Sequence, residues 1–220
     1  MALVSDRFPG VYAERGVFVA FEGGEGAGKS TQARLLRDRL EAQGHTVLLT
    51  REPGATPVGA EVRRIVLDPA TGALADRTEA LLYAADKAEH LHAVVRPALA
   101  RGEVVLTDRY VDSTLAYQGA GRSLAANDIA WVARWATEDL RPHLTVLLDL
   151  APSEGLTRFD GRDRIEGESI EFHQRVREQF LALAAADPEH YLVLDARSAE
   201  TQVADDVEAR LAPLLAQAVR

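Results

Sequence analysis

The residues most capable of chemistry form one continuous run, Gly23-Gly24-Glu25-Gly26-Ala27-Gly28-Lys29-Ser30. This run is a complete G-x-x-x-x-G-K-[ST] phosphate loop, and its lysine is one of only two in a chain with 23 arginines. Backbone N–H groups of such a loop wrap around phosphate oxygens, and the helix that follows adds partial positive charge. We expect Lys29 to reach the β- and γ-phosphates of ATP and the Ser30 hydroxyl to bind Mg²⁺. The residues expected to bind ATP are Gly23, Gly24, Glu25, Gly26, Ala27, Gly28, Lys29, Ser30 and Thr31.

A phosphate loop needs a strand before it and a helix after it, and the sequence supplies both. Residues 16–22 form a short apolar run, and residues 30–40 place apolar side chains at helical spacing. Strand-like runs recur with long helical patterns between them, at 17–21, 47–50, 104–107, 144–150 and 191–195. Such alternation predicts βαβ units. We therefore expect an α/β fold, a P-loop NTPase-like three-layer sandwich whose five-stranded parallel sheet is flanked by helices.

Charged residues follow the third strand-like run, where Asp108 and Arg109 stand side by side. Ligands of open parallel sheets collect beyond the carboxyl ends of the strands. An acid in this place is typical of the second acidic element of P-loop enzymes, which holds Mg²⁺ directly or through water. The guanidinium of Arg109 offers a planar fork for a phosphate. The alternative is a structural ion pair between the two residues.

The second strand-like run ends in Arg51-Glu52-Pro53-Gly54, and Arg63 lies in the helical pattern that follows. An ordinary solvated turn is the alternative for the first segment, because Pro-Gly marks many loops.

Tyr83 and Lys87 are four residues apart and share one helix face. A ring and a cation so placed can stack on and hydrogen-bond a base, although an aromatic at helical spacing is more often part of the core.

An arginine-rich stretch follows the fourth strand-like run, and its arginines are Arg158, Arg162 and Arg164. By itself such a stretch is most often a solvated loop. In a phosphoryl-transferring protein it can be a lid, here at about residues 156–168, whose arginines fold over the γ-phosphate and exclude water.

Composition narrows the classes of protein and of partner. The 220 residues carry a net charge of −9, which argues against a general attraction to nucleic-acid polymers or anionic membranes. The chain has no cysteine, hence no disulfide or thiolate site, and no apolar run of about 18 residues that would span a membrane. We expect a cytoplasmic protein with a flexible extension at residues 1–15 and a single domain at 16–220.

Four segments in this order resemble the thymidylate kinases, P-loop enzymes that phosphorylate dTMP with ATP. They are residues 21–32 around the phosphate loop, Thr50-Arg51-Glu52-Pro53-Gly54, the run 108–119 from Asp-Arg-Tyr to Ala-Tyr-Gln-Gly, and Asp163-Arg164-Ile165-Glu166. The phosphate loop is common to many families, whereas the second and third segments in this order are specific to this one. The resemblance implies phosphorylation of dTMP to dTDP for dTTP synthesis, with ATP and Mg²⁺.

The same resemblance assigns roles to individual residues. Tyr83 corresponds to the ring that stacks on thymine, Lys87 to the cation that binds its O4, and Tyr117 to the ring that crowds the sugar 2′ position. The residues implied in catalysis are Lys29, Arg109, Arg158, Arg162 and Glu25. The residues implied in dTMP binding are Arg51, Glu52, Pro53, Arg63, Tyr83, Lys87, Arg109, Thr114, Tyr117 and Gln118. The metal ligands implied are Ser30, Asp108 and Glu166.

Two features set this chain apart within the family. The family usually has Phe and Arg where this chain has Tyr83 and Lys87. At the thymine edge, the compact ammonium of lysine therefore replaces the planar guanidinium of arginine. The phosphate loop has no basic residue before Lys29, so the catalytic arginine is expected in the lid, as in the bacterial type.

The resemblance also implies a homodimer, for which the apolar pattern at 129–136 is either a contact face or core. The rival functions are kinase action on another nucleoside monophosphate and a P-loop ATPase or switch.

Overall fold

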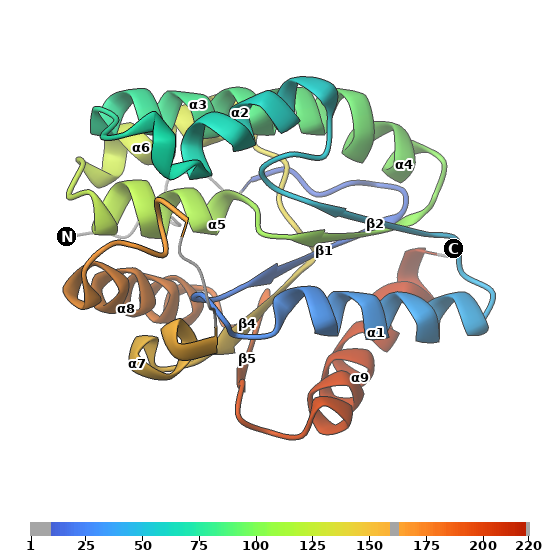
Figure 1. Ribbon diagram of the computed structural model, residues 1–220. Coiled ribbons are helices and arrows are strands. Elements are labelled where there is room, and N and C mark those ends of the chain that lie inside the picture. Colours follow the sequence, from blue (N-terminus) through green and yellow to red (C-terminus); the bar gives the residue numbers. More distant parts are fainter. Residues whose placement is uncertain (1–9, 159–162, 219–220) are drawn as a thin grey trace.

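The computed structural model describes residues 10–158 and 163–218 and contains one parallel sheet, with strands in the order β2-β3-β1-β4-β5 (Figure 1). The strands are β1 (Val17–Glu22), β2 (Val47–Arg51), β3 (Val104–Asp108), β4 (Leu144–Asp149) and β5 (Tyr191–Asp195). The five-stranded parallel sheet predicted from the sequence is confirmed, with strand ends within one residue of the expected ones.

The central strand β1 is buried along its whole length, as expected for a parallel sheet covered by helices on both faces. Its side chains alternate between two separate cores. Val17, Val19 and Phe21 pack toward one core, and Phe18 and Ala20 toward the other. This alternation fixes the register of β1, so the phosphate loop leaves the sheet at one defined edge.

Helices cover both faces of the sheet (Figure 1). On one face, α1 (Lys29–Ala42) and α9 (Glu200–Ala218) share an apolar core with the strands. The opposite layer contains α2 (Pro57–Leu67), α3 (Asp76–His90) and α6 (Ala126–Thr137). The remaining helical segments are η2 (Pro69–Thr71), η3 (Leu91–Val95), α4 (Arg96–Ala100), α5 (Val111–Thr114), η4 (Leu115–Gly121), α7 (Pro152–Gly155), η5 (Leu156–Arg158) and α8 (Ile170–Ala186).

One side of the apolar pattern at 129–136 belongs to the core of this chain, and its two tryptophans do not. Ile129, Ala130, Ala133 and Ala136 of α6 are buried, and α6 packs against α3. Large apolar side chains nevertheless remain at the surface of the same layer. Trp131 and Trp135 of α6 are 65% and 73% exposed, with their rings stacked, and Leu81 of α3 is 59% exposed.

Part of the expected N-terminal extension lies against the domain. Val11 pairs with Leu140, and the ring of Tyr12 stacks on His190. Residues 1–9 lie outside the described residues, and the boundary at residue 15 stays a prediction. Within residues 10–158 and 163–218, no helix has both the length and the apolar character needed to cross a bilayer.

Candidate active site

The phosphate loop joins β1 to α1 and depends on glycines for its shape. A Cβ at Gly26 would lie 2.5 Å from the carbonyl oxygen of Gly155, and Gly28 has φ +88° immediately before α1 begins. Other residues rarely adopt that φ. The ammonium of Lys29 donates to the carbonyl oxygens of Gly23 at 3.1 Å and Gly24 at 2.7 Å. The loop thus holds its lysine folded over the place where phosphates are expected.

The expected metal ligands come only partly together. The Ser30 hydroxyl donates to the Asp108 carboxylate, so two oxygen ligands of the kind that Mg²⁺ prefers stand side by side. Asp108 is bonded to Ser30 and not to Arg109, contrary to the alternative of a structural Asp–Arg pair. Glu166 instead accepts from the backbone N–H of Asp163 and lines a cavity that includes neither Ser30 nor Asp108. Its role as a metal ligand stays a prediction.

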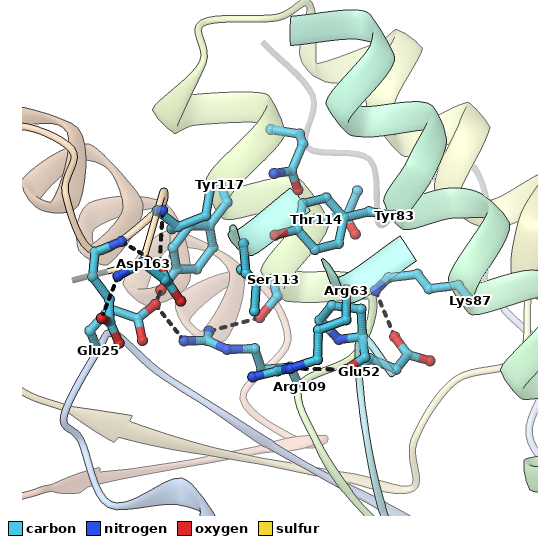
Figure 2. Close-up of a pocket in the computed structure, with 15 residues that line it drawn as sticks. Glu25, Glu52, Arg63, Tyr83, Lys87, Arg109, Ser113, Thr114, Tyr117 and Asp163 are labelled. Atoms are coloured by element: carbon cyan, nitrogen blue, oxygen red, sulfur yellow. Dashed lines mark hydrogen bonds and ion pairs between the residues drawn. The ribbon is translucent and has the colours of Figure 1, made fainter. Parts of the chain in front are cut away.

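Arg109 lines that cavity and is held there by several hydrogen-bond partners (Figure 2). Its guanidinium donates to Glu25 Oε1 at 2.6 Å, to Ser113 Oγ at 3.2 Å and to the Gly23 carbonyl at 3.1 Å. The Tyr117 hydroxyl donates to the same Glu25 oxygen at 2.7 Å, and the Tyr117 ring lies 5.0 Å from the guanidinium. Glu25, Arg109 and Tyr117 therefore form one hydrogen-bonded cluster beside the phosphate loop.

The backbone of Arg109 is itself unusual, with φ +72° in a residue that has a side chain. Such a conformation costs free energy and persists only when its surroundings hold it. Glu22, at the end of β1, helps to do this by accepting from the N–H groups of Tyr110 at 2.8 Å and Ser113 at 3.1 Å. Its other oxygen accepts from the Ser113 hydroxyl at 2.6 Å, and that hydroxyl in turn accepts from Arg109.

The two carboxyl groups near Arg109 differ in proton affinity. Burial and the nearby charge of Asp112 raise the pKa of Glu22 to about 7. Burial also acts to raise the pKa of Glu25, but the positive charges of Arg109 and Lys29 outweigh it and lower that pKa to about 2. At neutral pH, Glu25 is therefore a full negative charge paired with Arg109, whereas burial favours the protonated form of Glu22.

The segment after β2 is buried, contrary to the alternative of a solvated turn. Glu52 accepts from the Lys87 ammonium at 2.6 Å (Figure 2). It is also bonded to His90 Nδ1 at 2.7 Å. All three side chains are at most 2% exposed. Lys87 is thus held by a carboxylate at the cavity wall, and its binding to thymine O4 stays a prediction. Arg51 ends β2 and is exposed, outside the cavity lining.

The cavity has a volume of about 130 Å³ and brings together nearly all of the expected dTMP-binding residues (Figure 2). Thr114 Oγ1 is buried without a hydrogen-bond partner among the described residues. The expected residues in the lining are Glu25, Glu52, Pro53, Arg63, Tyr83, Lys87, Arg109, Thr114, Tyr117 and Gln118. The other lining residues are Leu67, Ser113, Asp163, Ile165 and Glu166.

A second, smaller cavity lies on the other side of the loop, lined in part by Gly28, Thr31 and Ser198. Arg158 also lines it and donates to the Gly26 carbonyl at 2.7 Å. Arg162 lies outside the described residues. Arg164 binds Glu79 on α3 and the Val66 carbonyl at the end of α2. Of the described arginines that the sequence places in a lid, Arg158 is therefore the one that hydrogen-bonds to the phosphate loop.

Sequence reasoning missed Glu22, Glu79 and Ser113. An acid at the end of an apolar strand was a signal for Glu22, because a charge there needs buried partners. Glu79 precedes Tyr83 by one helical turn, and this spacing placed it on the cavity side of α3. Ser113 gave no signal of its own, since a serine at the start of a helix is common.

Known proteins resemble this chain over most of its length. The family model described as thymidylate kinase matches residues 21–207. A thymidylate kinase from Cutibacterium acnes is 52% identical over 91% of this chain and 98% of its own length. One from Clavibacter sepedonicus is 54% identical over 91% and 97%. The crystal structure of thymidylate kinase from Ehrlichia chaffeensis superposes with a TM-score of 0.72 at 31% identity, covering 90% of this chain and 99% of that one.

The family match runs from the end of β1 through the phosphate loop and both cavities to α9. Identities near 50% over nine-tenths of the chain show that the relatives share its fold and reaction. The protein is an enzyme that phosphorylates dTMP to dTDP with ATP, and the chain belongs to the thymidylate kinase family.

Proposed function

We propose that the two cavities hold the two nucleotides, with dTMP on the Arg109 side of the phosphate loop and ATP on the Arg158 side. The observation that carries this proposal is that both cavities take lining residues from one loop, Glu25 for the first and Ala27 and Gly28 for the second. A phosphoryl group can then pass from donor to acceptor without leaving the loop.

Positioning and charge account for the chemistry. The transition state spreads negative charge over the equatorial oxygens of the transferring phosphoryl, and Lys29 and Arg158 provide compensating charge on the donor side. Arg109 binds the acceptor phosphate. That phosphate is already ionised at neutral pH, so no strong base is needed to deprotonate it. Ser30 and Asp108 fit Mg²⁺ by their oxygen ligands, and the ion supplies further positive charge to the ATP phosphates.

A coupled ADP-release assay tests the proposal, with ATP and Mg²⁺ and with dTMP, dUMP, dCMP, dGMP, AMP or no acceptor. We expect dTMP to give the highest kcat/KM and the reaction without acceptor to be negligible. ADP release that is equally fast without any acceptor would contradict the placement of an acceptor nucleotide in the Arg109 cavity. Equal rates with several acceptors would leave a nucleoside monophosphate kinase but would remove the thymine assignment for Tyr83 and Lys87.

We also propose a cytoplasmic homodimer, joined through the layer that carries Trp131, Trp135 and Leu81. Exposed stacked tryptophans are unusual on a monomer and typical of the anchors of an interface. Sedimentation of wild type and of the double substitution Trp131→Glu/Trp135→Glu tests this. The wild type should sediment as a dimer and the variant as a monomer with an unchanged far-UV spectrum. A variant that stays dimeric would exclude this face.

A further inference from the structure

Glu79, at the start of α3, is a carboxylate shared by three residues from two other segments. It is 1% exposed, and its Oε1 accepts from Gln118 Nε2 at 2.9 Å and from Arg122 Nε at 3.0 Å. Its Oε2 accepts from Arg122 Nη2 at 3.0 Å and from Arg164 of the lid. All four contacts are donations to Glu79. Gln118 is the only one of these partners that lines the acceptor cavity.

An ionised carboxylate has only acceptors, so the amide facing it must present its NH₂ group. The two arginines keep Glu79 ionised, because their hydrogen bonds, with that of Gln118, lower its pKa against the opposing effect of burial. The Nε2 of Gln118 is therefore committed to Glu79. Its Oε1 takes part in no hydrogen bond among the described residues and remains as an acceptor on a side chain of the cavity wall.

We propose that Glu79 is a positioning residue that selects the base, by locking the Gln118 amide so that an oxygen faces the acceptor nucleotide. Thymine and uracil carry a hydrogen on N3 and can donate to that oxygen. Cytosine has no hydrogen on N3. Its N3 and the Gln118 oxygen are both acceptors, so they would repel each other. This inference deepens the proposed function and rests on the placement of dTMP in the Arg109 cavity.

The substitution Glu79→Gln should reverse the amide. A glutamine must place an NH₂ group where one carboxylate oxygen stood. The Oε2 side faces two guanidinium groups that cannot turn into acceptors, whereas the Oε1 side faces one guanidinium and an amide that can rotate. The new NH₂ therefore belongs on the Oε1 side, where Gln118 rotates to accept from it. The Nε2 of Gln118 then faces the cavity as a donor.

The test compares kcat/KM for dTMP with kcat/KM for 5-methyl-dCMP, which keeps the methyl group and changes the donor and acceptor pattern of the base. The wild type should prefer dTMP by at least about 100-fold. E79Q should lower that ratio by at least about tenfold, as expected for inverting one buried hydrogen bond. The ratio does not depend on how much of the variant is folded and active. An unchanged ratio in E79Q would overturn the inference.

Two controls separate base selection from loosening of the lid. Glu168→Gln weakens the hold of Arg122 on the lid without touching Gln118, so its ratio should stay at the wild-type value. The ratio of dUMP to dTMP should also stay constant in E79Q, because both bases donate from N3. If E168Q lowers the dTMP preference as much as E79Q does, the lid and not the amide is responsible, and the inference fails.

Glu79→Asp is the substitute test variant if E79Q yields too little folded protein. This variant keeps an acceptor-only carboxylate, so turnover should fall while the dTMP preference is retained; loss of the preference would overturn the inference. A wild type that does not prefer dTMP over 5-methyl-dCMP would instead contradict the proposed thymine site itself. Failure of the inference and failure of the proposed function thus give different results.

Discussion

The two sides of the phosphate loop, which we propose bind the acceptor and the donor nucleotide, differ in how far their charged groups are buried and paired. On the proposed acceptor side, half-buried Arg109 is bound to Glu25 and buried Lys87 is bound to Glu52. On the donor side, Ser30 and Arg158 are exposed, and Lys29 and Arg158 donate to carbonyl oxygens of the loop. The cations of the proposed acceptor site are thus held by carboxylates, whereas those of the proposed donor site are bonded to backbone carbonyl oxygens of the loop.

This difference indicates where binding energy is used. A site whose side chains are fixed before binding loses little conformational freedom when the ligand arrives. A site with an exposed cation such as Arg158 loses more conformational freedom when its ligand binds. We therefore expect substitutions on the donor side to act mainly on kcat and those on the acceptor side to act mainly on dTMP binding.

The largest effect is expected at the donor side, from Arg158→Ala. Loss of an arginine at the transferring phosphoryl should lower kcat by about 10³-fold while the KM for dTMP changes less than about threefold. Steady-state kinetics with dTMP varied at saturating ATP measures both. Arg162→Ala is the matched comparison, since it tests the other lid arginine. A larger loss of kcat in R162A than in R158A would transfer the catalytic role to Arg162.

On the acceptor side, Arg109→Met should weaken dTMP binding by about 100-fold, because charge-assisted hydrogen bonds to the phosphate are lost. It also leaves Glu25 half-buried without its cation, so the protein should be less stable. The double variant Arg109→Met/Glu25→Gln should recover stability without recovering dTMP affinity. Titration calorimetry and urea denaturation check the two effects. Recovery of affinity in the double variant would show that Arg109 acts only by balancing Glu25.

A smaller effect is expected from pH on stability through Glu22. Its pKa is raised from 4.5 to about 7, so the fold favours the protonated form. The stabilisation from this group is fully present below pH 4.5 and is lost as the pH rises through about 7. Glu22→Gln removes this loss, so its stability relative to wild type should be greater at pH 8 than at pH 5, by about 1.4 kcal/mol for each unit of pKa shift.

Urea denaturation at the two pH values measures this difference. Glu25→Gln is the control, because the pKa of Glu25 is about 2 and its contribution is lost only as the pH falls toward that value. Its effect on stability should therefore be the same at pH 5 and pH 8. A Glu22→Gln variant with the same pH-independence would contradict the raised pKa of Glu22.

The smallest effect is expected from Tyr117→Phe. The ring remains beside Arg109, and only the hydroxyl that donates to Glu25 is lost. One such hydrogen bond is worth about 1 kcal/mol, so the KM for dTMP should rise about fivefold with little change in kcat. Kinetics at several dTMP concentrations decide this. A loss of kcat as large as that of R158A would mean that Tyr117 belongs to the chemistry and not to acceptor binding.

The sequence predicted the sheet and most of the cavity because these depend on local signals. Apolar runs set the strands, and a motif such as Gly28-Lys29-Ser30 carries its own geometry. It did not predict that Lys87 is bound to Glu52, or that Arg164 and Gln118 meet at Glu79. The two residues of each pair are between 35 and 85 positions apart in the sequence. Which buried polar groups become neighbours therefore depends on the folded chain.

Calorimetric titration of dTMP in the absence of ATP is the most direct test of a prepared acceptor site beside an unassembled donor site. We predict clear saturable binding whose Kd changes less than about threefold when Mg²⁺ and a non-hydrolysable ATP analogue are added. If dTMP does not bind until the analogue is present, or binds more than about tenfold tighter with it, the acceptor site is not prepared by the fold alone.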